Sequence, residues 1–537
     1  MAKSRSWLLN RKKTEPEVAY EPPFWFGDYS NGELYHEATP RERAMRRLIL
    51  ERGVELARYH GMERREFMAS GLGVALSFSV MNLLNGCDGG SSGGYVISDA
   101  SGDPVQRGDG GGGDLVGQSS MDGGRPTLPT DPAACEAALD YKDIFIFDVQ
   151  THRVESDNGV YRNFIMQLPQ ARCGRGTGAL ACFTKDEYVR RMFLESDTTV
   201  AVLSGVPAVD GVNPLTNDQI AETRDFVNGI ASESERVITH AMVLPNYNLD
   251  RQLEGMARLA TERAPLGAWK CYTPWGPGDG VTGFWLDDEK TGIPFIQRGR
   301  QLGVKTFCCH KGLPLPSFDN RYGDPKDIGV VAKMFPDCSF IVYHSAFQYG
   351  QMPGSGGTEE DRPYTMGDKV GVNALVTALL ENGHGHKSNI YGELGTTWIS
   401  VMTNVKRATH VLGKLLKYLG PDNVVWGTDS IWYGSPQAQL TTFLSFKMDQ
   451  QIREQEGYPD LTPEIKRKIL GLNAARLFNV DPQVTRCGIE AGAIARYKQE
   501  LDEEYGRYRW AFQQPRIRTR RDFMLHNLFH RAIKSPG

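Results

Sequence analysis

Eight short apolar runs, separated by amphipathic stretches, recur between residues 144 and 428 of this 537-residue chain. Alternating strands and helices indicate a parallel sheet with helices outside it, because parallel neighbours need a long crossover connection. Eight such units predict a (β/α)8 barrel over residues 131–480. A doubly wound open sheet is the alternative, but no glycine fingerprint follows the first run. The runs are 144–149, 199–206, 237–244, 267–272, 304–309, 339–344, 389–394 and 423–428.

The segments between these runs have the spacing of amphipathic helices. The last of them stops at Gly420, which Pro421 follows, so a helix end is expected just before the eighth strand. The clearest helical segments are 184–196, 217–234, 250–264 and 400–420.

Polar residues stand at the ends of the predicted strands. In a barrel of this kind, the C-terminal ends of all strands meet at one face, where active sites lie. Imidazole and carboxylate groups from different strands can converge there on one divalent cation such as zinc. The candidates are Gln150 and His152 after the first strand, Lys270 on the fourth, His310 on the fifth, His344 on the sixth, Glu393 on the seventh and Asp429 on the eighth.

Five short motifs in a fixed order make the predicted barrel similar to a known family. The domain resembles the amidohydrolase-related family, in the branch that also contains aminocarboxymuconate-semialdehyde decarboxylase. The resemblance extends over most of the chain that follows residue 130. The motifs are D-V-Q-T-H (148–152), F-C-C-H (307–310), V-Y-H-S (342–345), V-V-W-G-T-D-S (424–430) and L-N-A-A-R-L-F (472–478).

The resemblance implies a metal-dependent enzyme. His152 and His310 would be neutral nitrogen ligands, and Asp429 would bind the metal or its water and act as general base. His344 would face the substrate and polarise or protonate the reacting group. Zinc is the expected metal, with manganese or another oxygen-tolerant ion as the alternative. Asp148 is expected to support the site from behind or to end a strand in a turn.

Gln150 departs from the His-x-His pair that is usual at the end of the first strand. An amide oxygen can bind a hard cation, but it is a poorer zinc ligand than imidazole. Four outcomes are therefore open. Gln150 binds the metal through oxygen, the metal rests on three ligands and water, the site prefers manganese, or the site has lost its metal.

Long aromatic loops follow the fourth and sixth strands and predict a pocket for a partly apolar substrate. Trp275 and Trp285 lie in the first of these loops, and Trp432 follows the eighth strand. Lys270 would pair with an anionic group of the substrate or, if carboxylated, bridge two metals. Glu393 is expected to serve the pocket or to pair with a neighbouring basic residue.

Three functions fit this site. The first is hydrolysis of an amide, ester or lactone by metal-activated water, with Asp429 as base and His344 as polarising acid. The second is non-oxidative decarboxylation on the same scaffold. The third is a lipid-anchored binding protein with a degenerate site, for which Gln150 is the best support.

The chain before the barrel has features of an export signal. Arg64 and Arg65 precede an uncharged segment that runs from Phe67 to Cys87, as in a twin-arginine signal. A buried helix and a signal anchor are the alternatives. The end, 84-LNGC-87, resembles a lipobox, so Cys87 is a candidate for lipidation and membrane anchoring. We therefore expect export to the periplasm or cell envelope.

The remaining segments are expected to be accessory. Residues 1–61 form a polar and basic preface, unless translation starts at Met62, at the head of the predicted signal segment 62–87. Residues 88–130 form a linker rich in glycine and serine, and residues 481–537 a helical and basic extension.

Charge and cysteine content limit the partners of the chain. A net charge of -4 gives no basic footprint for nucleic acid. Cys173 and Cys182 flank a glycine-rich loop that a disulfide could close in an oxidising compartment. The expected partners are a small-molecule substrate and, through the signal or lipid anchor, a membrane; a homo-oligomer stays open.

Overall fold

A computed structural model gives the fold of the chain, and most of residues 143–505 belong to its main body. The predicted lipidation residue Cys87 and the basic segment 516–537 lie outside the described residues. The described residues are 22–27, 29–30, 35–36, 38–85, 93–96, 121–122, 125–126, 143–156, 162, 165, 168, 170, 179–231, 235–278, 280–314, 318–348 and 362–505.

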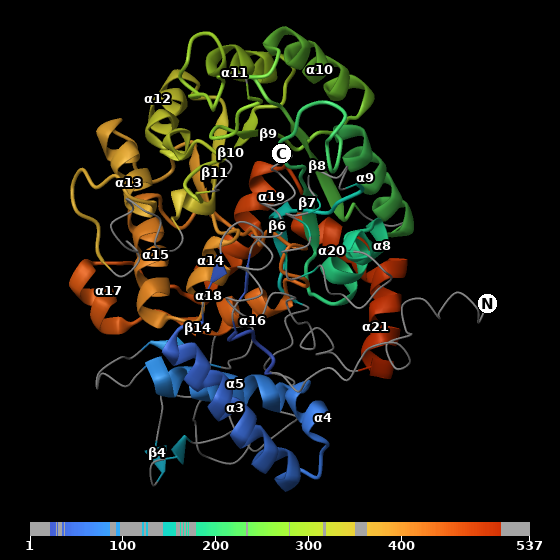
Figure 1. The fold of residues 1–537 in the computed structure, drawn as a ribbon, viewed down its shortest axis with the longest axis vertical. Coiled ribbons are helices and arrows are strands. Elements are labelled where there is room, and N and C mark those ends of the chain that lie inside the picture. Colours follow the sequence, from blue (N-terminus) through green and yellow to red (C-terminus); the bar gives the residue numbers. More distant parts are fainter. Residues whose placement is uncertain are drawn as a thin grey trace, which may run out of the picture.

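Eight parallel strands form one sheet in chain order, from β6 to β13, with helices around it (Figure 1). The first and last strands also meet, because Thr151 and Ser430 form a parallel bridge. Across this seam Asp429 N donates to Gln150 O at 3.0 Å. The sheet is therefore a closed barrel, and the predicted fold class is confirmed. The strands are β6 Phe147–Thr151, β7 Val200–Leu203, β8 Val237–Met242, β9 Ala268–Tyr272, β10 Thr306–His310, β11 Ser339–Tyr343, β12 Ile390–Glu393 and β13 Val424–Val425.

The helices of the barrel follow the predicted segments, with one difference. The segment 400–420 is interrupted at Asn404, whose side chain accepts the N–H of Arg407 and starts a new helix. The barrel helices are α8 Lys185–Val189, α9 Asn217–Ala231, α10 Leu249–Glu262, α11 Gly292–Gln301, α12 Lys326–Met334, α13 Val372–Glu381, α14 Thr397–Val401, α15 Val405–Tyr418, α16 Gln437–Ser445, α17 Gln450–Glu456, α18 Pro463–Arg467 and α19 Asn473–Leu477.

The barrel interior changes from apolar to polar along its axis. Side chains such as Phe147, Val200 and Ile341 belong to one buried apolar cluster near the start of the strands. Strand register then sets Lys270 beside Cys308 and His310 beside Tyr272. The strands therefore carry their ionisable residues toward the C-terminal face.

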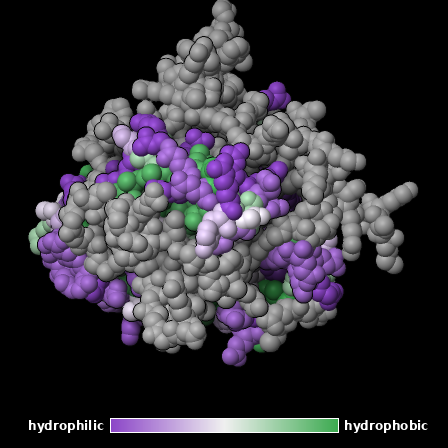
Figure 2. Space-filling view, turned by 90° about the horizontal axis from the view of Figure 1, so that it is seen from below, coloured by the Kyte–Doolittle hydropathy of each residue, from purple (hydrophilic) through white to green (hydrophobic). Residues whose placement is uncertain are grey.

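Residues before the barrel form a second layer, which we call the N-terminal layer: α3 Pro40–Tyr59, α4 Arg64–Met68, α5 Gly71–Asn85 and β3 Gly94–Tyr95. It lies below the barrel in Figure 1, and β3 pairs antiparallel with β14, Phe446–Lys447. On the face seen from that side, the described residues that come to the surface are mainly hydrophilic, with smaller apolar areas between them (Figure 2).

The uncharged segment of the predicted signal is a buried helix in this structure. In α5, the twelve residues from Gly71 to Asn82 are all buried. Asn82 both accepts from Tyr95 N and donates to Tyr95 O, each at 2.7 Å. The buried helix that the sequence left as an alternative describes α5 here, and export stays a prediction. Tyr95, within the expected linker, is also buried.

No helix of the described residues is both long and apolar enough to cross a membrane. After the barrel, the described part of the C-terminal extension forms two helices. Ile494 and Leu501 pack in one apolar cluster with Met192 and Phe193. The two helices are α20 Pro482–Ala491 and α21 Ala493–Tyr505.

The expected disulfide between Cys173 and Cys182 can be followed at Cys182 alone. Cys182 is disulfide-bonded, and its expected partner Cys173 lies outside the described residues. Cys308 and Cys309 are buried free thiols.

Candidate active site

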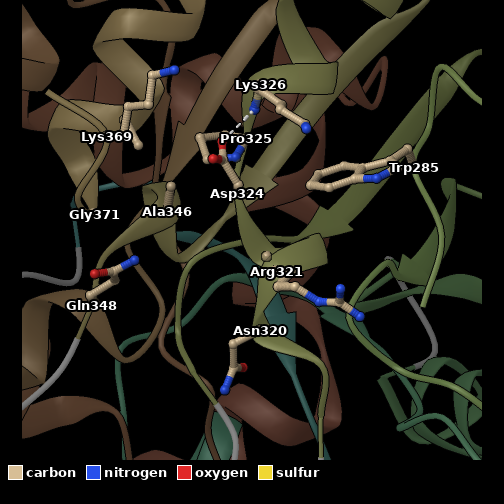
Figure 3. Close-up of a pocket in the computed structure, with 12 residues that line it drawn as sticks. Trp285, Asn320, Arg321, Asp324, Pro325, Lys326, Ala346, Gln348, Lys369 and Gly371 are labelled. Carbon is tan, nitrogen blue, oxygen red and sulfur yellow. Dashed lines mark hydrogen bonds between the residues drawn. The ribbon is translucent and has the colours of Figure 1, made fainter. Parts of the chain in front are cut away.

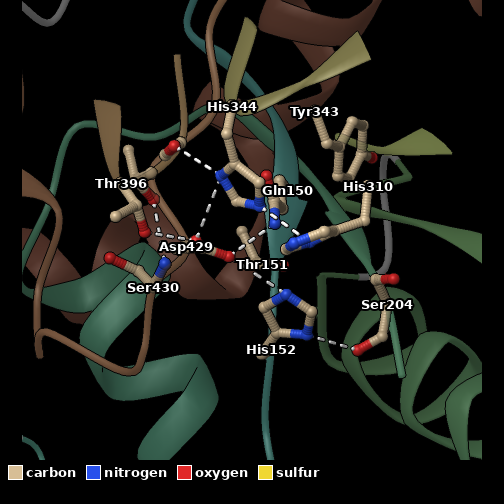
Figure 4. Close-up of polar contacts among 12 residues, drawn as sticks. Gln150, Thr151, His152, Ser204, His310, Tyr343, His344, Thr396, Asp429 and Ser430 are labelled. Atoms are coloured by element: carbon tan, nitrogen blue, oxygen red, sulfur yellow. Dashed lines mark hydrogen bonds and ion pairs between the residues drawn. The ribbon is translucent and has the colours of Figure 1, made fainter. Parts of the chain in front are cut away.

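Four of the predicted residues meet at the C-terminal face of the barrel (Figure 4). His152 Nε2 lies 3.1 Å from Asp429 Oδ1, and His344 Nε2 lies 3.2 Å from His310 Nδ1. His344 Nδ1 lies 3.8 Å from Asp429 Oδ2 and connects the two pairs. All four side chains are almost fully buried. These four residues, which are far apart in the sequence, are therefore close together in the folded chain.

Backbone carbonyls fix the tautomer of each of these imidazoles. His152 Nδ1 lies 2.9 Å from Ser204 O, His310 Nε2 lies 3.0 Å from Leu313 O, and His344 Nδ1 lies 2.8 Å from Gly395 O. A carbonyl oxygen can only accept, so each of these ring nitrogens carries the proton. In His310 and His344, the other nitrogen bears a lone pair when the ring is neutral.

The lone pairs of His310 and His344 face each other. Burial is the main cause that lowers the pKa of His344 to about 4 and that of His310 well below its usual value, so both rings are neutral at pH 7. Two unprotonated nitrogens, one from each ring, then stand 3.2 Å apart. Only a proton or a cation between them would make this contact favourable. The donor set of this pocket fits a divalent cation.

The donor atoms are of the types that bind a divalent cation, but they are not arranged around one common position. Within the described parts of the chain, no three His, Cys, Asp or Glu side chains form a group that could hold a metal ion. The donors meet in pairs instead. Each imidazole does have the outer hydrogen bond to a carbonyl that metal-binding histidines usually make.

Gln150 contributes an orphaned oxygen to the same pocket. Its Nε2 donates to Asp429 Oδ1 at 2.6 Å. Its buried Oε1 has no hydrogen-bond partner. A buried amide oxygen without a partner is costly, and a cation or a donor on a ligand would satisfy it.

Asp429 is held as a carboxylate. Burial alone would raise its pKa, but the hydrogen bond to His152 and the nearby His344 and Thr396 keep it well below the usual value. Thr396 Oγ1 donates to Asp429 Oδ2 and lies 3.0 Å from Tyr433 Oη. Asp429 is therefore ionised at neutral pH and can accept a proton.

Two buried carboxylates, Asp148 and Glu393, fix the backbone that carries the residues of the site. Asp148 accepts from Gln150 N and Thr428 N, both at 3.1 Å, and so ties the first strand to the last. Glu393 accepts from His344 N at 2.8 Å and also from Gly395 N. Burial raises the pKa of Asp148 to about 7 and that of Glu393 well above its usual range. Glu393 thus lies behind His344 and fixes its backbone.

Lys270 lies inside the barrel without a hydrogen-bond partner. Its Nζ is buried and stands 3.3 Å from the centre of the Tyr343 ring and 4.8 Å from that of Tyr272. Burial lowers its pKa to about 8. A buried ammonium without a hydrogen-bond partner is a natural partner for an anionic group.

Strained backbone concentrates at this face. Five described residues around the site have a left-handed φ, which non-glycine residues rarely adopt. Such strain tends to persist where function requires a fixed geometry. The residues are His344 (65°), Ser345 (49°), Ala346 (58°), Thr396 (56°) and Asp429 (59°).

The predicted aromatic residues take different positions. Trp432 stacks on His152, with ring centres 4.9 Å apart and planes 9° apart. Trp285 lines a separate cavity. Trp275 packs against Tyr247 in a small apolar cluster. Trp432 therefore closes one side of the site, whereas Trp275 supports a neighbouring loop.

Sequence reasoning missed two residues of this region. Thr396 binds Asp429, and its only signal was a position just after the seventh strand. His240 lies deeper on β8, with Nε2 3.2 Å from Tyr343 Oη and 3.4 Å from Cys308 Sγ. His240 was missed because it lies within its strand rather than at the end.

The fold and this cluster define a class of protein: (β/α)8 barrels with a histidine and aspartate site at the mouth. The amidohydrolase family profile matches residues 188–480, more than half of the chain, and the chain belongs to this family. The family predicted from the five motifs is confirmed.

Comparison with curated proteins gives no match. Among solved structures, the chain is similar to a 5-carboxyvanillate decarboxylase from Novosphingobium aromaticivorans with bound manganese, at 12% identity and a TM-score of 0.36, over 63% of this chain and 98% of that one. It is also similar to dihydroorotases from Campylobacter jejuni (13%, TM-score 0.34, 63% and 84% covered) and Saccharomyces cerevisiae (10%, 0.35, 64% and 86%).

Proposed function

We propose that this amidohydrolase is a metal-dependent hydrolase that cleaves an amide, ester or lactone in a small, partly apolar substrate. One observation carries the proposal: the neutral imidazoles of His310 and His344 face each other, and the ionised Asp429 lies beside both His344 and His152. Such a set is typical of a site that holds a cation and moves a proton.

The residues that would hold the metal are His152, His310, Asp429 and, through its orphaned oxygen, Gln150. A divalent cation there would lower the pKa of a bound water and polarise a carbonyl. The mixed nitrogen and oxygen donors suit zinc or manganese.

Asp429 is the proton acceptor in this proposal. Its carboxylate is ionised, and Gln150 Nε2 and Thr396 Oγ1 hold its two oxygens in place. It takes a proton from water, the water oxygen bonds to the carbonyl carbon, and the C–N or C–O bond breaks. The proton then goes to the leaving nitrogen or oxygen.

His344 needs a revised role in the resting protein. Its Nδ1–H is bound to Gly395 O, and its Nε2 bears a lone pair. It can therefore accept a proton or hydrogen bond at Nε2 first and act as an acid only afterward. Lys270 would neutralise an anionic group of the substrate.

Decarboxylation is the second candidate, and Lys270 is the observation that favours it. An unpartnered buried ammonium would bind a substrate carboxylate. In that reaction the C–C bond to the carboxylate breaks, carbon dioxide leaves, and a proton from the protein takes its place on carbon.

The purified full chain should be tested on a panel of esters, lactones, amides and aromatic carboxylates. We expect acid release from the first three classes, and we expect chelator treatment to abolish it. Release of carbon dioxide without hydrolysis would favour decarboxylation as the function. The absence of both reactions, together with no bound metal, would favour the binding protein.

A further inference from the structure

A cavity of about 410 Å³ lies at the C-terminal face, beside the loops that follow the two histidine-bearing strands β10 and β11. Its wall includes Ala346, two residues after His344. Ala346 is packed so closely against Gly312 that a Cβ on that glycine would lie 2.1 Å from Ala346 C. The size lies within the usual range for small-molecule sites. The catalytic residues described above do not line it.

The lining of this cavity is basic. Figure 3 shows Lys369 and Gln348 on one side, with Lys326, Trp285 and Arg321 on the other. Arg321 is paired with Asp319, at 2.6 Å. Lys326 Nζ stands 4.0 Å from the centre of the Trp285 ring.

Two of these cations have no carboxylate partner. Neither Lys326 nor Lys369 forms an ion pair with any described residue. The one carboxylate in the lining, Asp324, accepts the backbone N–H of Lys326 at 2.9 Å and ends the preceding turn. The cavity therefore keeps an excess of positive charge.

A buried ion pair stiffens the wall beneath. Lys311 and Asp327 have fully buried side chains, and Lys311 Nζ lies 2.8 Å from Asp327 Oδ2. Lys311 also donates to Tyr322 O at 3.0 Å and to Asp324 O at 3.1 Å. The loop that carries Arg321 and Lys326 is thus held in place before any ligand arrives, which reduces the entropy lost on binding.

We propose that this cavity is an anion subsite that takes a carboxylate or phosphate group on the part of the substrate remote from the reacting bond. The inference rests on the proposed function for its link to substrate, but the binding itself is testable without activity. Lys326 and Lys369 supply the charge, Gln348 a hydrogen-bonding amide, and Trp285 an apolar face.

Calorimetric titration with benzoate and with inorganic phosphate tests this directly. We compare the parent chain, the double variant Lys326→Gln/Lys369→Gln, and Lys333→Gln, which removes an exposed charge from the same helix α12 outside the cavity. At low salt the double variant should bind about tenfold more weakly, while Lys333→Gln should bind like the parent.

The outcomes distinguish a carboxylate ligand from a phosphate ligand, and they test the subsite separately from the proposed function. Binding of benzoate alone indicates a carboxylate substrate, and binding of phosphate alone a phosphate ester. Equal affinity in the parent and the double variant would overturn the subsite. Lys270→Met is titrated beside these variants, and a loss of affinity confined to it would also overturn the subsite, because the anion would then lie in the barrel. A metal-free protein that hydrolyses nothing but keeps the charge-dependent affinity would refute the proposed function and leave the subsite standing.

Discussion

The mouth of the barrel and the N-terminal layer are both buried, but they bury different residues. The mouth buries ionisable groups, among them Asp429, His344 and Lys270. The layer buries a helix without a charge, α5, and an aromatic stack in which Phe78 lies between Phe24 and Tyr95 with ring centres 5.1 and 5.2 Å apart. Apolar burial stabilises a fold, whereas buried ionisable groups usually cost stability. The contrast indicates that the layer maintains the structure and the mouth carries the chemistry.

The largest expected effect is at the mouth. Asp429→Asn removes the proton acceptor while keeping the shape of the side chain, so kcat should fall about 10²- to 10⁴-fold. The rate is measured on the best substrate from the panel. Glu289→Gln, which removes an exposed carboxylate from the loop after β9, should leave the rate unchanged. A parent-like rate in Asp429→Asn would mean that the base is another residue.

The layer should respond in stability rather than in rate. Phe78→Ala leaves a cavity in a fully buried stack and should lower the free energy of unfolding by about 3–5 kcal/mol. Urea denaturation measures it, and the rate per folded molecule should not change. Tyr59→Ala is the control, because Tyr59 is 75% exposed. An unchanged midpoint in Phe78→Ala would show that the layer is not part of the cooperative fold.

Two buried lysines should respond in opposite directions. Lys311 is paired with Asp327, so Lys311→Met should destabilise the protein by about 3–5 kcal/mol. Lys270 has no hydrogen-bond partner, so Lys270→Met should stabilise it at pH 7, by about 1–3 kcal/mol. A loss of stability in Lys270→Met would contradict the absence of a partner.

Lys270 also predicts a pH dependence. Burial lowers its pKa to about 8, so between pH 8 and about 10.5 the unfolded chain holds more protons at this site than the folded chain. Stability should therefore rise with pH in this window, because unfolding takes up protons. Lys270→Met should lack this part of the rise, which denaturation at several pH values measures.

The smallest effect is expected at Gln150. Replacing the amide by imidazole in Gln150→His restores the usual ligand pair, so the metal dissociation constant should fall about tenfold. Competition with a chelator measures it. A weaker metal affinity in Gln150→His would mean that the amide oxygen is the better ligand in this pocket.

The parts of this molecule differ in how far sequence alone predicts them. The eight runs predict the barrel because parallel strands need helical crossovers, and the ends of the strands predict His152, His310, His344 and Asp429 as one cluster. The carbonyl partners of those imidazoles could not be predicted, because Ser204, Leu313 and Gly395 act through backbone atoms that any residue offers.

The N-terminal segment shows a second limit. An uncharged stretch after Arg64 and Arg65 has the same composition whether it serves as an export signal or as a helix buried in the protein core. Only the contacts of α5 separate the two, such as Asn82 with Tyr95. Export remains our proposal for this chain, with the disulfide of Cys182 as support from chemistry, since such bonds persist in oxidising compartments.

The metal content of the purified chain decides whether the mouth of the barrel is a metal site. The full chain and the Asp429→Asn variant should be purified after expression with zinc or manganese supplied. Their metal content per chain is then measured by inductively coupled plasma mass spectrometry. We expect about one divalent metal per parent chain and its loss in Asp429→Asn. If the parent chain holds no metal under either supply, the mouth is not a metal site, and the facing lone pairs of His310 and His344 must share a proton instead.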